Sequence, residues 1–279
     1  MAVMAASNLM KSKITFLTVL LFAGISFAAE PWAVAKLDKS TRHGEWVVVT
    51  NGTRPVECWV VYPEVKDKAT AVVLIHDIFG LGDWAREVTD EVAAAGYIAI
   101  MPDLLSGAAP NGGKASDFTN TSAIGPAIRK LPASQVTGDL NAAADYVKAL
   151  AAANGKVVVA GFCWGGDQSF RFACNRPDLK AAFVFYGTAP SAENLARIQC
   201  PVYGFYAGND GRVTITVTDT NQPNTKDLMK QAGKTYEPVI YDGAGHGFMK
   251  GGEDPAGRDG DKKARDAAWT RWQDLLKKI

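Results

Sequence analysis

Histidine and cysteine are scarce in this chain, and charge of either sign is balanced. The 279 residues include three histidines and four cysteines. The cysteine spacing matches no zinc-binding pattern, and three histidines are too few to complete one, so we expect no metal site. Lys and Arg total 30 against 29 Asp and Glu, a net charge of +1. No block of like charge is present, which argues against a nucleic-acid partner.

Long apolar runs are also rare, and the clearest one lies at the N-terminus. Lys11 and Lys13 precede an apolar stretch over residues 14–25, and the small residues Ser26 and Ala28 follow it. This order is typical of a secretory signal, and the stretch is too short for a comfortable membrane span. We therefore expect a signal peptide over residues 1–28, with an uncleaved membrane anchor as the alternative.

The rest of the chain, residues 29–279, suits one large α/β domain. After cleavage it would be secreted or periplasmic, with no stable membrane insertion. We favour a monomer, and the sequence does not define the oligomeric state. Export would place the cysteines in an oxidising compartment, where a disulfide is allowed. The pairing among Cys58, Cys174 and Cys200 is left open.

Strand-like and helix-like segments alternate after an antiparallel start. Residues 45–50 and 56–62 flank Asn51-Gly52, a strong hairpin signal. Further strands are predicted at 71–75, 97–101, 156–160, 181–186, 202–207 and 236–241, and helices at 83–95, 136–153, 164–173 and up to about 276. The pattern predicts a mostly parallel central sheet with an antiparallel N-terminal hairpin and helices on both faces. Residues 103–134 lack periodicity and predict a cap, lid or binding loop.

One hexapeptide indicates a catalytic nucleophile. Residues 161–166 read Gly-Phe-Cys-Trp-Gly-Gly and follow a buried apolar strand. A strand that enters a helix through such a glycine-rich turn indicates a nucleophile elbow, with Cys163 as the nucleophile. The alternative is an inert core thiol, since free cysteines are mostly buried and unreactive.

A catalytic thiol needs a base and a group that orients the base. His246 lies in a glycine-rich loop after the last predicted strand, whereas His43 precedes the first strand and His76 ends another. We therefore predict His246 as the base, with a solvated loop histidine as the alternative. Asp210 follows the 202–207 strand and is the predicted acid.

The rivals of Asp210 are Asp219 and Asp242, which lack its placement at a strand end. An ordinary turn aspartate is the remaining alternative. The order nucleophile, acid, histidine is typical of the α/β-hydrolase arrangement. An oxyanion hole needs two backbone N–H groups, for which we predict Trp164, next to the nucleophile, and Ile78, in the loop after His76.

The chain resembles the dienelactone hydrolase family over about residues 45–277. The resemblance rests on five segments, namely His76–Gly80, Pro102-Asp103-Leu104, the cysteine elbow, Asp210 with Val213, and Gly245–Phe248. It implies an α/β-hydrolase fold, a Cys163-His246-Asp210 triad, no cofactor, and hydrolysis of a small ester or lactone through a thioester. An acyltransferase or thioesterase on the same fold, or a binding protein with an oxidised Cys163, is the alternative.

The pocket departs from the family pattern at three positions. Asp77 stands where the family has a glutamate that helps to control the cysteine proton. Ser106-Gly107 and Lys250 stand where the family has arginines that hold a substrate carboxylate. Dienelactone is therefore not the expected natural substrate.

Aromatic residues near the elbow are predicted to line the substrate pocket, namely Phe79, Trp84 and Trp164. Packing in the core is an equally good interpretation of Trp84. Trp269 and Trp272 lie three residues apart on the last predicted helix, and packing against the sheet explains them.

Overall fold

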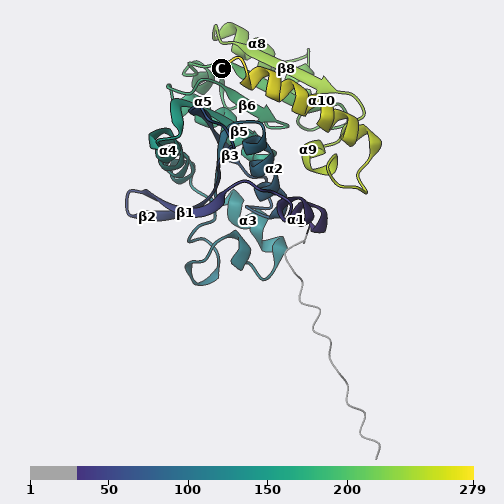
Figure 1. Ribbon diagram of the computed structural model, residues 1–279. Coiled ribbons are helices and arrows are strands. Elements are labelled where there is room, and N and C mark those ends of the chain that lie inside the picture. Colours follow the sequence, from purple (N-terminus) through teal and green to yellow (C-terminus); the bar gives the residue numbers. More distant parts are fainter. Residues whose placement is uncertain (1–29) are drawn as a thin grey trace, which may run out of the picture.

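A computed structural model describes residues 30–279, which form one eight-stranded sheet with helices around it (Figure 1). The sheet order is β1-β2-β4-β3-β5-β6-β7-β8. The first two strands form the predicted hairpin, β2 runs antiparallel to β4, and the remaining neighbours are parallel. The strands are β1 (Gly44–Asn51), β2 (Arg54–Val61), β3 (Ala69–Ile75), β4 (Ile98–Pro102), β5 (Ala153–Phe162), β6 (Ala182–Phe185), β7 (Val202–Ala207) and β8 (Tyr236–Tyr241). The predicted fold class is confirmed.

Helices cover both faces of this sheet. They are α1 (Pro31–Leu37), α2 (Asp83–Ala94), α3 (Ile124–Arg129), α4 (Ala133–Ala149), α5 (Trp164–Asn175), α6 (Ala192–Leu195), α7 (Ile215–Thr218), α8 (Thr225–Gln231), α9 (Phe248–Gly251) and α10 (Asp259–Leu276). Three short 3₁₀ turns, η1 (Pro110–Gly112), η2 (Ala115–Asp117) and η3 (Thr121–Ala123), lie between β4 and α3. In this part of the chain, no helix has the length and apolar character needed to cross a bilayer.

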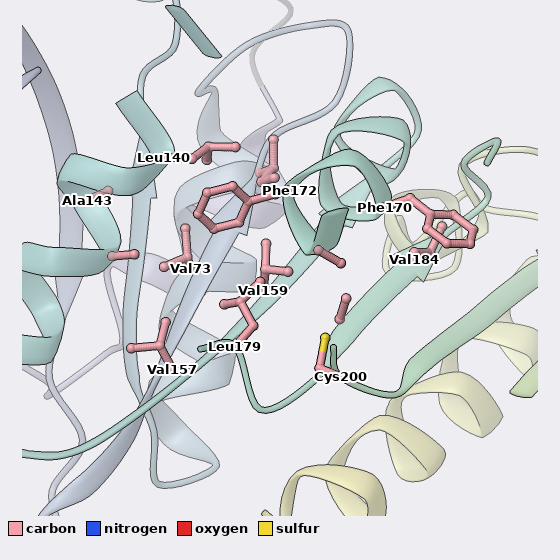
Figure 2. Close-up of a cluster of buried hydrophobic side chains, with 14 of the residues drawn as sticks. Val73, Leu140, Ala143, Val157, Val159, Phe170, Phe172, Leu179, Val184 and Cys200 are labelled. Carbon is pink, nitrogen blue, oxygen red and sulfur yellow. The ribbon is translucent and has the colours of Figure 1, made fainter. Parts of the chain in front are cut away.

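Two cores hold the layers together, one on each face of the sheet. Under α4 and α5, strand residues Val73 and Val159 pack against Leu140 and Phe172 (Figure 2). On the other face, α1, α2 and α10 bury a cluster that includes Trp84, Phe162 and Trp272. Alternate residues of each central strand supply the two cores, because successive side chains point to opposite faces.

One predicted helix is displaced at both ends. The helix predicted over residues 136–153 begins earlier, at Ala133, and ends at Ala149. Leu150 has an extended backbone (ψ 140°), and β5 begins at Ala153. The polar pair Asn154-Gly155 then lies inside the strand, where Gly155 takes a positive φ of 81°. The predicted signal peptide over residues 1–28 lies outside the described residues.

Trp272 is expected to make the largest single contribution to the core beneath α10. It is fully buried, and its ring centroid lies 5.0 Å from that of Phe185 and 6.1 Å from that of Phe162. Trp272→Ala should lower the free energy of unfolding by about 3–5 kcal/mol through lost burial and the cavity left behind. Urea unfolding measures this. Trp46→Ala, at a side chain 42% exposed, is the matched control and should cost much less. Equal losses would contradict this core assignment.

Candidate active site

Cys163 lies in a strained turn between β5 and α5. Its backbone has φ 56° and ψ −119°, a conformation that residues with a side chain rarely adopt. The glycines are required by close backbone contacts: a Cβ at Gly161 would lie 1.9 Å from the Gly165 oxygen, and one at Gly165 would lie 2.3 Å from the Ile75 oxygen. The local geometry is that of a nucleophile elbow, and it leaves the Cys163 side chain half-buried at the rim of the sheet.

His246 and Asp210 meet at the same rim. Asp210 follows β7, His246 follows β8, and the Nδ1 atom of His246 lies 2.5 Å from Oδ2 of Asp210. The two loops are joined by a hydrogen bond in which the N–H of Asn209 donates to the carbonyl of Ala244 over 2.8 Å. Because β7 and β8 are parallel neighbours, their carboxyl ends deliver both side chains to one place.

The Cys163 side chain interacts with the His246 imidazole. That interaction and the bond to Asp210 raise the pKa of His246 to about 9, against the opposing effect of partial burial. A raised pKa means that the imidazolium is favoured, which is the form that stabilises a neighbouring thiolate. The structure therefore brings together the three residues predicted as a triad.

Tyr186 is a residue of the site that no sequence pattern indicated. It directly follows β6 and is buried, with a positive φ of 40°. Its ring lies edge-on to His246, with centroids 5.1 Å apart, and also contacts Phe248. Burial raises its pKa well above the ordinary tyrosine value, with Asp77 and Cys163 adding to the effect. Tyr186 thus fixes one side of the histidine ring.

His76 is not available as a base, which removes the nearest rival of His246. Its ring is fully buried and stacks on Trp164 at 5.8 Å. Nδ1 lies 2.8 Å from the carbonyl of Asp77, and Nε2 faces the N–H of Leu104 at 3.4 Å. Burial lowers the pKa of His76, so the neutral ring serves as a spacer between the two loops.

The backbone N–H groups of Ile78 and Trp164 donate to no backbone carbonyl within residues 30–279. Trp164 is the first residue of α5, where helix geometry leaves the donor unsatisfied. These are the two donors that the sequence predicted for an oxyanion hole.

Asp77, Phe79, Trp84 and Lys250 line one cavity of about 160 Å³, whereas Trp164, also predicted to line the substrate pocket, is not part of its lining. The remaining lining comes from Glu30, Gly80, Gly82, Asp83, Ala85, Thr121 and Ile124. Cys163, Asp210 and His246 are not among its lining residues, but Ile124, which lines it, belongs to a small core against which Ile78 and Trp164 pack. Trp84 is 2% exposed, so it belongs to the core and to the cavity wall at once.

Asp77 is a buried residue of the cavity lining. One of its carboxylate oxygens accepts the N–H of Phe79 at 2.8 Å. Burial raises the pKa of Asp77, and the positive charge of Lys250 opposes that shift. Asp77 therefore holds the loop that carries the Ile78 N–H.

The segment over residues 103–134 supplies a wall of the cavity through Thr121 and Ile124. Asp103 ties the first part of this segment together by accepting the N–H groups of Leu105 and Ala115 at 3.0 and 2.9 Å. At Gly107, where the family has an arginine, φ is +74° and an added Cβ would lie 3.2 Å from the Arg54 guanidinium. A long side chain at that position would be strained and crowded.

All four cysteines lie in the described residues, and all are free thiols. Cys58, Cys174 and Cys200 are buried. Burial raises the pKa of Cys174 to about 11 and that of Cys200 to about 12, so these thiols stay protonated near neutral pH. Cys163 differs from these three in being only half-buried and in lying beside His246.

The fold and the constellation at the rim define an α/β-hydrolase. The model of the dienelactone hydrolase family matches residues 56–279. The chain is 31% identical over 189 residues to a "Putative carboxymethylenebutenolidase" of Methylorubrum extorquens, an alignment covering 63% of this chain and 62% of that protein. Because the family match spans more than half of the chain, the chain belongs to the dienelactone hydrolase family, and it is a carboxylic ester hydrolase.

Solved structures share the fold. A crystal structure of a "Putative Dienelactone Hydrolase" from Klebsiella pneumoniae has a TM-score of 0.72 at 21% identity, covering 86% of this chain and 100% of that one. Dienelactone hydrolase from Anabaena variabilis has a TM-score of 0.58 at 20% identity, covering 82% and 96%. These likenesses support the sheet topology described above.

Proposed function

We propose that this protein hydrolyses a small uncharged ester or lactone through a covalent thioester on Cys163. The observation that carries the proposal is the thiol in a strained elbow beside an imidazole that is itself hydrogen-bonded to a buried carboxylate. Each member of this set is supplied by a different strand end, so the arrangement depends on the whole sheet and not on one local motif.

In the first half of the reaction, the Cys163 thiolate attacks the acyl carbon. The carbonyl oxygen becomes an oxyanion, and the N–H groups of Ile78 and Trp164 are suited to stabilise it. The tetrahedral intermediate then collapses, the carbon–oxygen bond to the alcohol breaks, and His246 gives its proton to the leaving oxygen. The product is a thioester and a neutral imidazole.

In the second half, the neutral His246 takes a proton from water, which attacks the thioester carbonyl. The same two N–H groups stabilise the second oxyanion. Collapse releases the carboxylic acid and returns the thiolate and the imidazolium. Asp210 keeps the imidazole in the tautomer and orientation that both proton transfers need.

The pH dependence of acylation follows from the raised pKa of His246. Because the imidazolium must protonate the leaving alcohol, kcat/KM for an alkyl ester should fall as pH rises through about 9, where that proton is lost. This decrease is measured with an ethyl ester by pH-stat titration. Asp210→Asn removes one of the interactions that raise the pKa of His246, so the decrease should occur at lower pH.

A 4-nitrophenyl ester is the matched control, since its leaving group departs without a proton. Its kcat/KM should stay nearly level over the same pH range. If both esters lost activity over the same pH range, His246 would not be the proton donor.

The free thiol of Cys163 favours this catalytic proposal over a binding protein with an oxidised cysteine. Export through residues 1–28 stays part of the proposal on the strength of the sequence alone.

A further inference from the structure

Glu30 lines the cavity described above, although it lies 133 residues before Cys163 in the sequence. One carboxylate oxygen accepts the N–H of Trp84 at 2.7 Å, and the other forms an ion pair with Lys250. Burial raises the pKa of Asp77, and the negative charge of Glu30 adds a smaller effect in the same direction.

Helix α1 holds Glu30 in this position. Glu30 precedes the helix, and its carbonyl accepts the N–H groups of Ala33 and Val34 at 2.8 and 3.0 Å. The buried side chain of Ala33 anchors the helix to the core, and Lys36 binds Glu253 at 2.7 Å. Glu30 is thus a fixed part of the cavity wall (α1, purple, beside α2 in Figure 1).

Lys250 is the one cation among the described residues that line the cavity. Its ammonium faces Glu30 and lies 5.3 Å from the Phe79 ring centroid and 5.9 Å from that of Trp84. Three carboxyl groups, those of Glu30, Asp77 and Asp83, share the lining with it. An arriving carboxylate would therefore meet a cation whose charge is already neutralised by Glu30.

We propose that Glu30 is a specificity-determining residue that neutralises Lys250 and restricts this site to acyl groups without a negative charge. The inference rests on the proposed ester hydrolysis and names its substrate class. The apolar surfaces of Phe79, Trp84 and Ile124 contact the acyl chain, while the Glu30–Lys250 pair excludes a carboxylate at its far end. Removing the charge of Glu30 frees Lys250 to bind that carboxylate.

The test compares two substrates that differ by one charge. They are the 4-nitrophenyl monoester of adipic acid and its methyl-capped diester, both followed by nitrophenolate release. The wild-type protein should prefer the capped ester by about ten-fold or more in kcat/KM, as expected for unfavourable charge at short range near a protein surface. The preference should shrink at high salt, because ions screen the repulsion.

Glu30→Gln keeps an acceptor for the Trp84 N–H and removes the charge. It should raise kcat/KM for the anionic ester about ten-fold, mainly through KM, and bring the two substrates close to parity. In Glu30→Gln/Lys250→Met the gain should disappear, since no cation remains to bind the carboxylate. Glu193→Gln, an exposed glutamate in the first turn of α6, is the matched control and should keep the wild-type preference.

An unchanged substrate preference in Glu30→Gln would overturn the inference while leaving ester hydrolysis intact. Binding separates this outcome from failure of the proposed function. Calorimetry with phenylacetamide and phenylacetate needs no turnover: the wild-type protein should bind the amide more tightly, and Glu30→Gln should gain affinity for the carboxylate. Equal affinities in both proteins would contradict the role of Glu30 even if no ester were hydrolysed.

Discussion

Replacing Cys163 with alanine should reduce the turnover of a short 4-nitrophenyl ester by on the order of 10⁴-fold or more. The sulfur atom is the only group at the elbow that can form the covalent intermediate, and a water attacking directly would have to be activated without it. Alanine must adopt the same strained φ of 56°, which it tolerates less well than glycine would. The fold of the Cys163→Ala variant should therefore be checked by circular dichroism.

The matched control is Cys174→Ala, which removes a buried thiol from the same helix, α5. Its activity per folded molecule should stay within about two-fold of the wild type, because its thiol lies in the core away from the rim. Activity that survived in Cys163→Ala would refute the nucleophile assignment. A loss of equal size in both variants would point to a structural cause.

His246→Ala should lower kcat/KM by a similar factor, on the order of 10⁴-fold. Loss of the imidazolium also removes the charge that stabilises the thiolate, so alkylation of Cys163 by iodoacetamide at pH 6–7 should slow markedly. The double variant Cys163→Ala/His246→Ala should be no worse than either single one, because residues that act as a unit are not additive.

His43→Ala is the control for this experiment. His43 has an exposed side chain, stacks on Tyr62 and lies near Glu45, so its loss should leave alkylation and turnover unchanged. If His246→Ala kept the wild-type alkylation rate at pH 6–7, the thiolate would be stabilised by another group, and the assigned role of His246 would be wrong.

The sheet could be predicted because its strands are short apolar runs bounded by clear turn signals. The hairpin at Asn51-Gly52 and the strand before the elbow follow directly from local sequence. Helix ends were less predictable, as the stop at Ala149 shows, because Leu150 and Ala151 to Ala153 have no strong local preference against helix. The short helices α1, α6, α7, α8 and α9 form through tertiary packing and carry no periodic signal of their own.

The residues of the site likewise include some that the sequence predicts and some that it does not. Cys163, Asp210 and His246 are recognisable because each follows a strand, and parallel strands end at one edge. Glu30 and Tyr186 could not be found by that rule. Glu30 precedes the first helix, and its distant neighbours are set by how α1 packs on α2. Tyr186 looks like one more apolar strand residue until its backbone turns at φ 40°.

The proposed mechanism requires a covalent bond between the acyl group and the sulfur of Cys163. Acid quenching during steady-state turnover of a slow ester, followed by intact mass measurement and peptide mapping, detects this bond. We expect a mass increase equal to the acyl group, located on Cys163 and removed by hydroxylamine. Turnover with no acyl group on that sulfur, or with the acyl group on another residue, would contradict it.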